Sequence, residues 1–106
     1  MVRQFQNLIA SEQVHAMFAV NDIMALGAVE AIEQAGRTGE ILVLGFDAVD
    51  DAREAIREGR MAASIAQHPA AMGRLAVENS LRVVNGEAIP TFIPVPIELI
   101  TKENVD

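Results

Sequence analysis

The chain has 106 residues, of which 51% are apolar, and it carries a formal net charge of -7 and no cysteine. This length predicts one domain or part of one, and the acidic balance argues against a surface for nucleic acid or an anionic membrane, because such surfaces need clustered cations. The lack of cysteine excludes disulfides, thiolate metal sites and cysteine nucleophiles. No apolar run approaches the roughly 20 residues of a membrane-spanning helix, and the first residues do not have the pattern of a signal peptide.

The first third of the chain predicts two helices and one strand. Apolar residues recur with helical spacing at the start, so we expect a helix over residues 2–11. The nearly continuous apolar run of residues 15–20 is typical of a strand that is buried on both faces. A narrow polar stripe then predicts an otherwise apolar helix over residues 23–35, and Gly36 ends it.

The middle of the chain repeats this alternation. Residues 41–46 and 61–66 are predicted to be further strands, with a helix around residues 50–58 between them. Asp50 and Asp51 are candidates for the cap of that helix, because short acidic side chains accept hydrogen bonds from first-turn N–H groups.

The last third predicts a long helix and a return strand. Pro69 suits the first turn of a helix that we expect over residues 69–85. Pro94 and Pro96 cannot donate ladder hydrogen bonds, so the following segment is expected to be extended, with a strand at residues 97–100. Helices and strands thus alternate along the whole chain. This order predicts an α/β fold, a doubly wound parallel sheet in three α-β-α layers.

Three predicted strands each end on a short polar side chain, namely Asn21, Asp47 and Gln67. If the strands are parallel, these side chains line one edge of the sheet, which is where open α/β folds bind their ligands. Amide and carboxylate groups are suited to holding hydroxyls, because they offer both donors and acceptors. The pattern therefore favours a ligand-binding edge over a catalytic one.

Each of these residues also has a purely structural interpretation. Asn21 and Asp22 both precede a helix, and either side chain is able to cap it. Asp47 is compatible with an Asx turn, and Gln67 with a chain turn before His-Pro. Phe46 is expected to pack in the core, with contact to the apolar side of a sugar as its alternative role.

No catalytic or metal-binding pattern stands out. The serines lack a nucleophile-elbow context, the two histidines have no matching serine and acid, and no metal-ligand spacing is present. A flavodoxin-like signalling or nucleotide-binding domain is disfavoured, because no glycine-rich loop follows a strand and Lys102 lies almost at the end of the chain. The sequence predicts no enzyme activity, no cofactor and no metal.

Four segments of the chain resemble one known family. Residues 19–28 (AVNDIMALGA), 43–47 (VLGFD) and 63–67 (ASIAQ) are similar to the C-terminal part of periplasmic ribose-binding proteins, which are type I solute-binding proteins of sugar ABC importers. The tail at residues 97–105 is similar to the ends of such proteins. The resemblance runs from end to end of the chain and covers roughly the last third of a family member.

The resemblance implies a role in binding a sugar. In that family two α/β lobes close over the sugar, the positions that match Asn21, Asp47 and Gln67 bond its hydroxyls, and the position of Phe46 lies alongside it. It implies ribose or a similar pentose as ligand, a membrane permease as partner, and a periplasmic or extracellular location. The N-terminal lobe of the family is not present, so we expect this chain alone to bind sugar weakly or not at all.

The resemblance also divides residues 1–106 into three parts. Residues 1–67 correspond to part of the C-terminal lobe, residues 68–96 to a segment that packs on the missing N-terminal lobe, and residues 97–106 to a returning strand and tail. The strand at residues 15–20 then lacks a neighbour, and an unpaired apolar edge is a template for association. We therefore expect self-association by edge pairing or exchange of elements.

The alternative to transport is transcriptional control. The effector-sensing core of LacI-type repressors that respond to sugars has the same two-lobed fold and similar Asn-Asp and Gly-Phe-Asp patterns. A signal peptide upstream favours transport, whereas a basic helix-turn-helix favours repression. Within this chain, the tail favours transport modestly.

Overall fold

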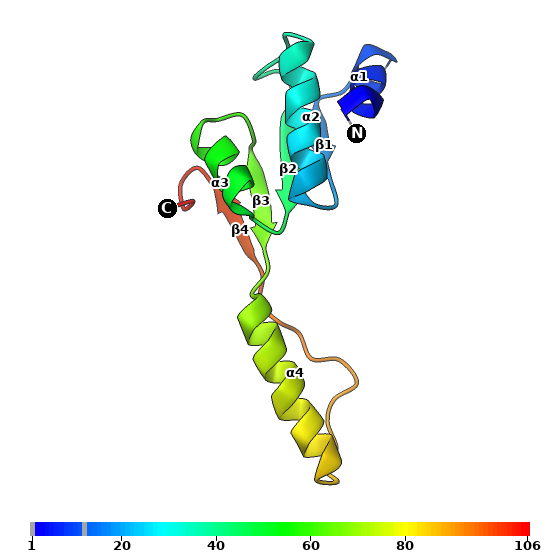
Figure 1. Ribbon diagram of the computed structural model, residues 1–106, viewed down its shortest axis with the longest axis vertical. Coiled ribbons are helices and arrows are strands. Elements are labelled where there is room, and N and C mark those ends of the chain that lie inside the picture. Colours follow the sequence, from blue (N-terminus) through cyan, green and yellow to red (C-terminus); the bar gives the residue numbers. More distant parts are fainter. Residues whose placement is uncertain (1, 12) are drawn as a thin grey trace. The chain divides into compact units, whose positions relative to one another are not determined.

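The computed structural model describes residues 2–11 and 13–106, and within them four helices alternate with four strands (Figure 1). The order and type of the elements are those that the sequence predicts. The elements are α1 (Val2–Ser11), β1 (Ala16–Phe18), α2 (Asp22–Gln34), β2 (Leu42–Phe46), α3 (Asp50–Arg57), β3 (Ala63–Ala66), α4 (Pro69–Val84) and β4 (Glu98–Thr101).

The chain folds as two compact units. The first contains the residues up to Ala66 together with Glu98–Asp106, and the second contains Gln67–Ile97. The first unit therefore holds all four strands and helices α1 to α3, whereas the second holds α4 and the extended segment that follows it.

The sheet of the first unit has the strand order β1-β2-β3-β4. The first three strands are parallel neighbours, with Phe18 paired to Leu44 and Phe46 paired to Ile65. This arrangement confirms the predicted α/β class. The last strand runs antiparallel to β3, with Ala66 paired to Glu98, because the chain re-enters the sheet beside the point at which β3 left it. The sheet is thus mostly parallel.

One face of the sheet carries the core of the first unit. Met17, Val43 and Ile100 point to this face and are buried, and α2 lies against β1 and β2 (Figure 1). The helices approach closely because their inward residues are small: Ala25, Ala28, Ala52 and Ala55 are fully buried.

The opposite face is apolar but much more open. Phe18 is 60% exposed and Leu42 and Leu99 are also exposed, although all three are large apolar residues. The prediction that residues 15–20 form a strand buried on both faces is wrong, because burial in β1 alternates and only one face is covered. An apolar run in the sequence reports which side chains favour burial, and it does not report whether a partner is present.

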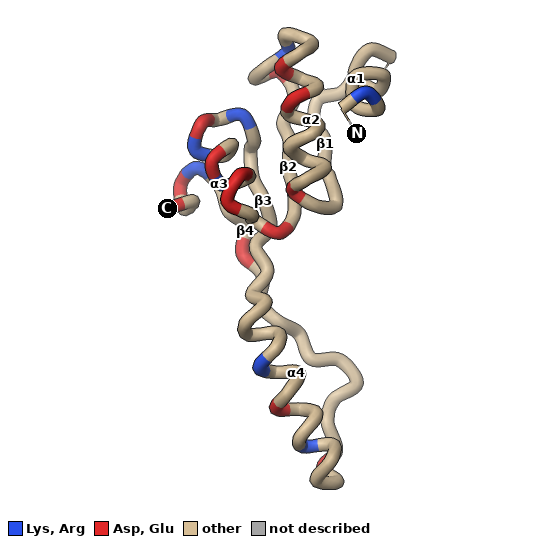
Figure 2. Tube along the Cα trace, in the orientation of Figure 1, with Lys and Arg blue, Asp and Glu red and all other residues tan. Residues whose placement is uncertain are grey.

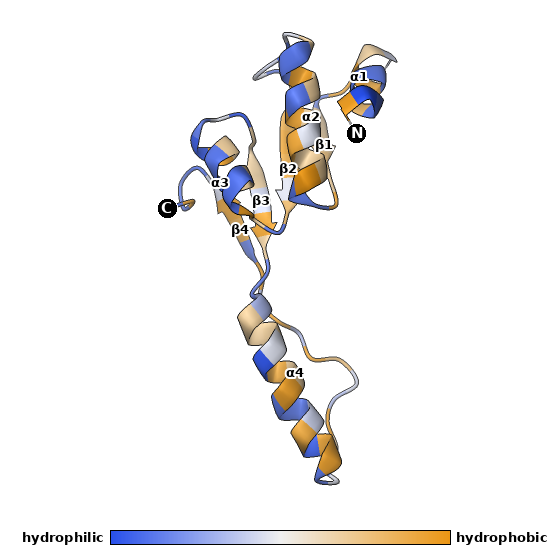
Figure 3. Ribbon diagram, viewed as in Figure 1, coloured by the Kyte–Doolittle hydropathy of each residue, from blue (hydrophilic) through white to orange (hydrophobic). Residues whose placement is uncertain are grey.

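The second unit consists of α4 and an extended segment that returns along it (Figure 1). No residue of α4 is buried, although the helix is largely apolar (Figure 3). Val77, Leu81 and Val84 are exposed, Val84 to 81%. Figure 2 shows few charges along α4, and Arg74 Nε lies 3.8 Å from Glu78 Oε1. A solvated helix of this kind exposes an unusually large apolar surface.

None of the helices in the described residues has the length and apolar character that crossing a membrane requires.

Candidate functional site

The carboxyl ends of β1 and β2 lie side by side at one edge of the sheet. Their parallel pairing continues beyond β1, since Ala19 N donates to Leu44 O at 2.9 Å. Asn21 follows β1 and is half-buried, and Asp47 follows β2 directly and is exposed. The topology thus brings the predicted amide and the predicted carboxylate to the same edge.

Asn21 caps helix α2. Its backbone is extended, with φ -151°, and its Oδ1 atom accepts a hydrogen bond of 2.9 Å from Met24 N. Of the two cap candidates that the sequence offered, Asn21 is the cap and Asp22 is the first residue of the helix. The cap uses Oδ1 as an acceptor, and the Nδ2 group of the same side chain is a donor.

The backbone turns sharply at Asp47. Asp47 has φ 109° and the next residue, Ala48, has φ 53°, and these are the only non-glycine residues with positive φ in the part of the chain that the structure describes. Side chains with a Cβ rarely adopt such angles, so surrounding contacts must hold them. Asp47 N donates to Ile65 O at 2.8 Å, which joins this turn to β3.

Two buried polar side chains stand directly behind this turn. Asp22 and Ser64 are 1% and 0% exposed, and Ser64 Oγ donates to Asp22 Oδ1 at 2.6 Å. Ser64 Oγ accepts from Ala48 N at 3.0 Å, and Asp22 Oδ2 accepts from Val49 N at 2.8 Å. Both side chains therefore bind the backbone that follows Asp47.

The sequence did not point to this pair. Asp22 has the local interpretation of a helix cap, and Ser64 is one of the serines that lack a nucleophile-elbow context. The position of Ser64, a polar residue inside an apolar strand, was a sequence signal that could have pointed to a buried hydrogen bond. In the structure Ser64 is in register with Gly45. The expected capping of α3 by Asp50 or Asp51 is also wrong: the cap residue is Val49, no side chain caps it, and its N–H is bound by Asp22 instead.

Phe46 and Gln67 complete the set of predicted ligand residues. Phe46 ends β2 and is half-buried, on the open face of the sheet with Leu42 and Ile65. Gln67 directly follows β3 and is the first residue of the second unit. Contact between a sugar and either residue stays a prediction.

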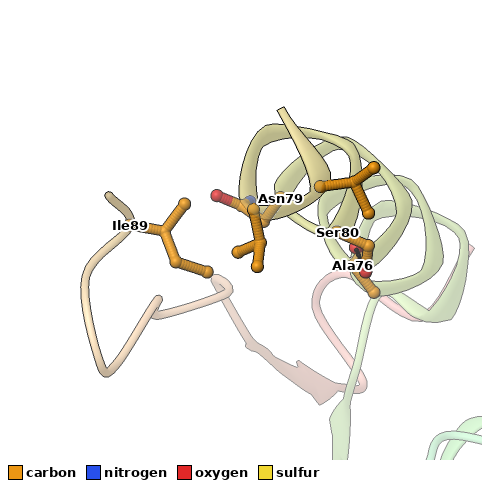
Figure 4. Close-up of a pocket in the computed structure, with 6 residues that line it drawn as sticks. Ala76, Asn79, Ser80 and Ile89 are labelled. Carbon is orange, nitrogen blue, oxygen red and sulfur yellow. Dashed lines mark hydrogen bonds between the residues drawn. The ribbon is translucent and has the colours of Figure 1, made fainter. Parts of the chain in front are cut away.

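The second unit contains an apolar groove of about 520 Å³ between α4 and Ile89 (Figure 4). Its polar lining residues bond their own helix, since Asn79 Nδ2 donates to Leu75 O and Ser80 Oγ donates to Ala76 O. The rest of the lining is aliphatic. The groove is therefore mainly apolar, whereas a sugar is held by several convergent polar groups.

No group of three or more metal-binding side chains lies together in residues 2–11 and 13–106. At the edge of the sheet, the geometry combines an amide donor at Asn21 with a carboxylate at Asp47. Amide and carboxylate groups are both suited to hydrogen-bonding hydroxyls.

A family description of the periplasmic binding protein domain matches residues 1–88. The chain belongs to this family. Both the family description and the names of the curated relatives are those of binding proteins.

Curated relatives within the periplasmic binding proteins include ribose import binding protein RbsB from two bacteria. The Haemophilus influenzae protein is 42% identical over 98 residues, which is 92% of this chain and 33% of that protein. The Escherichia coli protein is 41% identical over 99 residues, again 92% of this chain and 33% of the relative. The chain thus spans about a third of the length of the curated relatives that it matches.

Solved structures of periplasmic binding proteins share this fold. A solute-binding protein of an ABC transporter from Actinobacillus succinogenes, with bound D-allose, superposes with a TM-score of 0.88 at 33% identity, over 98% of this chain and 37% of that one. A solute-binding protein from Bacillus halodurans, with bound myo-inositol, gives a TM-score of 0.82 at 35% identity, over 98% and 36% of the two chains.

Proposed function

We propose that this chain supplies part of a solute-binding protein for ribose or a similar pentose, which delivers the sugar to the membrane permease of an importer. The observation that carries the proposal is the placement of Asn21 and Asp47 at the carboxyl ends of adjacent parallel strands, in a chain 42% identical to a ribose import binding protein. The relatives named above lend no support to the repressor alternative. The proposal includes a periplasmic or extracellular location and no catalysis.

In this proposal four residues contact the sugar. Asn21 donates from Nδ2 to a hydroxyl oxygen, because the helix cap already uses its Oδ1 atom. Asp47 accepts hydroxyl protons through a carboxylate, which makes stronger hydrogen bonds than a neutral acceptor. Gln67 adds a further amide, and Phe46 lies against the apolar side of the ring.

The chain by itself is expected to bind ribose weakly or not at all. The relatives are about three times as long, and an open edge leaves most of a sugar in water, where hydroxyl hydrogen bonds contribute little net free energy. Titration calorimetry with ribose should show no saturable tight binding. Binding with a micromolar or lower Kd by this chain alone would contradict the proposal that the site is incomplete.

The chain is also expected to self-associate. β1 is an edge strand, and the open face beside it exposes Phe18 and Leu42, so a second copy can bury apolar surface and pair with the edge. Light scattering at micromolar concentration should give a mass above 11.4 kDa. The double variant Phe18→Lys and Leu42→Lys should lower that mass, whereas Leu8→Lys, on α1, should not. A stable monomer of the parent chain would refute the prediction.

A further inference from the structure

The turn after β2 is held in a conformation that its residues do not favour. Asp47 and Ala48 both have positive φ, and neither is a glycine. Because an L side chain at such angles crowds its own backbone, a free loop with this sequence relaxes to negative φ. Contacts from outside the loop must therefore keep the two residues in place.

Hydrogen bonds from three different elements supply these contacts. Asp47 N–H donates to Ile65 O and Ala48 N–H donates to Ser64 Oγ, both on β3. Val49 N–H donates to Asp22 Oδ2 on α2. Arg53 Nε, on α3, donates to Ala48 O at 3.0 Å. Every peptide N–H of the turn is thus satisfied by a group that lies outside it.

The direction of the protons in this arrangement is fixed by chemistry. Ala48 N–H can only donate, so Ser64 Oγ accepts from it and has one proton left to donate to Asp22 Oδ1. Val49 N–H can only donate as well, so Asp22 must present an acceptor at both oxygens. A carboxylate fulfils this requirement, whereas the amide of asparagine offers a single acceptor.

The space for Asp22 is provided by Gly45 on β2. A Cβ atom at Gly45 would collide with Asp22 Oδ1 and would lie 2.6 Å from Met61 Cε. The missing side chain thus allows a carboxylate to lie directly on the strand that ends at Asp47. At the base of the turn, Asp22 and Ser64 therefore bind the backbone, and Gly45 leaves the space that Asp22 occupies.

We propose that Asp22 and Ser64 are positioning residues for Asp47: they hold the left-handed turn and so fix the direction in which the Asp47 carboxylate leaves the sheet. The inference rests on the proposed function, in which Asp47 binds the sugar and neither Asp22 nor Ser64 touches it. It adds two specificity-determining residues that act through the backbone. Affinity for the sugar then depends on two side chains that are buried away from it.

The test compares Ser64→Ala with Ser64→Thr in the full chain, by NMR of the labelled protein without sugar. Alanine removes the acceptor for Ala48 N–H, and threonine keeps a hydroxyl at the same place. In Ser64→Ala, the amide protons of Ala48 and Val49 should exchange with water at least about tenfold faster, relative to amides of β2, than in the parent chain. The intraresidue amide-to-α-proton signals that mark positive φ at Asp47 and Ala48 should weaken.

Ser64→Thr should restore both signatures, and Ile32→Val should leave them unchanged. Ile32 is a buried residue of α2, so this variant controls for a general loss of stability. Asp22→Asn is a second probe and should release Val49 N–H or Ser64, because its amide cannot accept both bonds. Retention of parent-like exchange and of positive φ in both Ser64→Ala and Asp22→Asn would overturn the inference.

A ribose titration of the same Ser64 variants, placed in the chimera that the Discussion describes, tests the two proposals separately. A weaker ribose affinity in Ser64→Ala, restored in Ser64→Thr, supports the positioning role. An unchanged ribose affinity in a Ser64→Ala chimera whose turn has relaxed overturns it. The proposed function itself is tested with a completed binding site, as described in the Discussion, and its failure there leaves the sugar-free result for the turn in place.

Discussion

Replacing Gly45 by alanine should lower the free energy of unfolding by about 2 to 4 kcal/mol, which is large for the addition of one methyl group. The new Cβ atom would overlap Asp22 Oδ1 and would lie 3.0 Å from Ala25 Cβ. Asp22 can escape only by giving up hydrogen bonds to Ser64 and Val49, and both partners would then be left without an acceptor. Urea unfolding followed by far-UV circular dichroism measures the change, since the chain has no tryptophan or tyrosine.

Gly73→Ala is the matched control for this prediction. Gly73 lies inside α4, and nothing lies within 4 Å of where its Cβ would be, so the same chemical change should leave stability equal or raise it by up to about 1 kcal/mol. If Gly45→Ala unfolds within about 0.5 kcal/mol of the parent chain, Asp22 is not confined as described.

Completing the binding site should raise the affinity for ribose by at least about 100-fold over that of the chain alone. The experiment is a chimera in which this chain replaces the matching third of the Haemophilus influenzae relative, to which it is 42% identical. The other two thirds of the relative would enclose the sugar. The hydrogen bonds from Asn21 and Asp47 would then contribute more to the binding free energy, because water is excluded from the site. Calorimetry with ribose gives the Kd.

Within the chimera, two substitutions test the assigned contacts. Asp47→Asn removes the charge and should weaken binding by about 10- to 100-fold, because hydrogen bonds to a charged group are the stronger kind. Asn21→Asp keeps an oxygen to cap Met24 N and removes the Nδ2 donor, so it should weaken binding without unfolding α2. Asn7→Asp, an exposed change on α1, serves as the control. Equal ribose affinity in all three would contradict the proposed function.

The order of the elements could be predicted because its signals are local. Apolar periodicity and a helix-ending glycine such as Gly36 can each be recognised within a few residues of sequence. The helices and strands lie within a few positions of where they were expected. The exposure of Phe18 could not be predicted in this way. Its burial depends on whether another element covers the sheet, and the apolar run around it is the same in either case.

The candidate site was predictable to a similar degree. Asn21 and Asp47 were placed at one edge because strand ends are visible in the sequence and parallel strands share their carboxyl edge. The Asp22–Ser64 contact joins residues 42 positions apart, and each had a plausible local interpretation. The left-handed turn could not be predicted from the sequence either. Asp47 and Ala48 are not glycines, and long-range hydrogen bonds hold them at positive φ.

Because β4 runs antiparallel to β3, these two strands form a hairpin, and the second unit is inserted between them. The last pair of that ladder is Ala66 with Glu98, and every residue from Gln67 to Ile97 is inserted between them. Neighbouring antiparallel strands need only a tight connection of about two residues. Pairing of β3 with β4 therefore does not require the inserted second unit. Gain or loss of that unit is a topologically simple change that leaves Asn21, Asp47 and the positioning residues Asp22 and Ser64 in place.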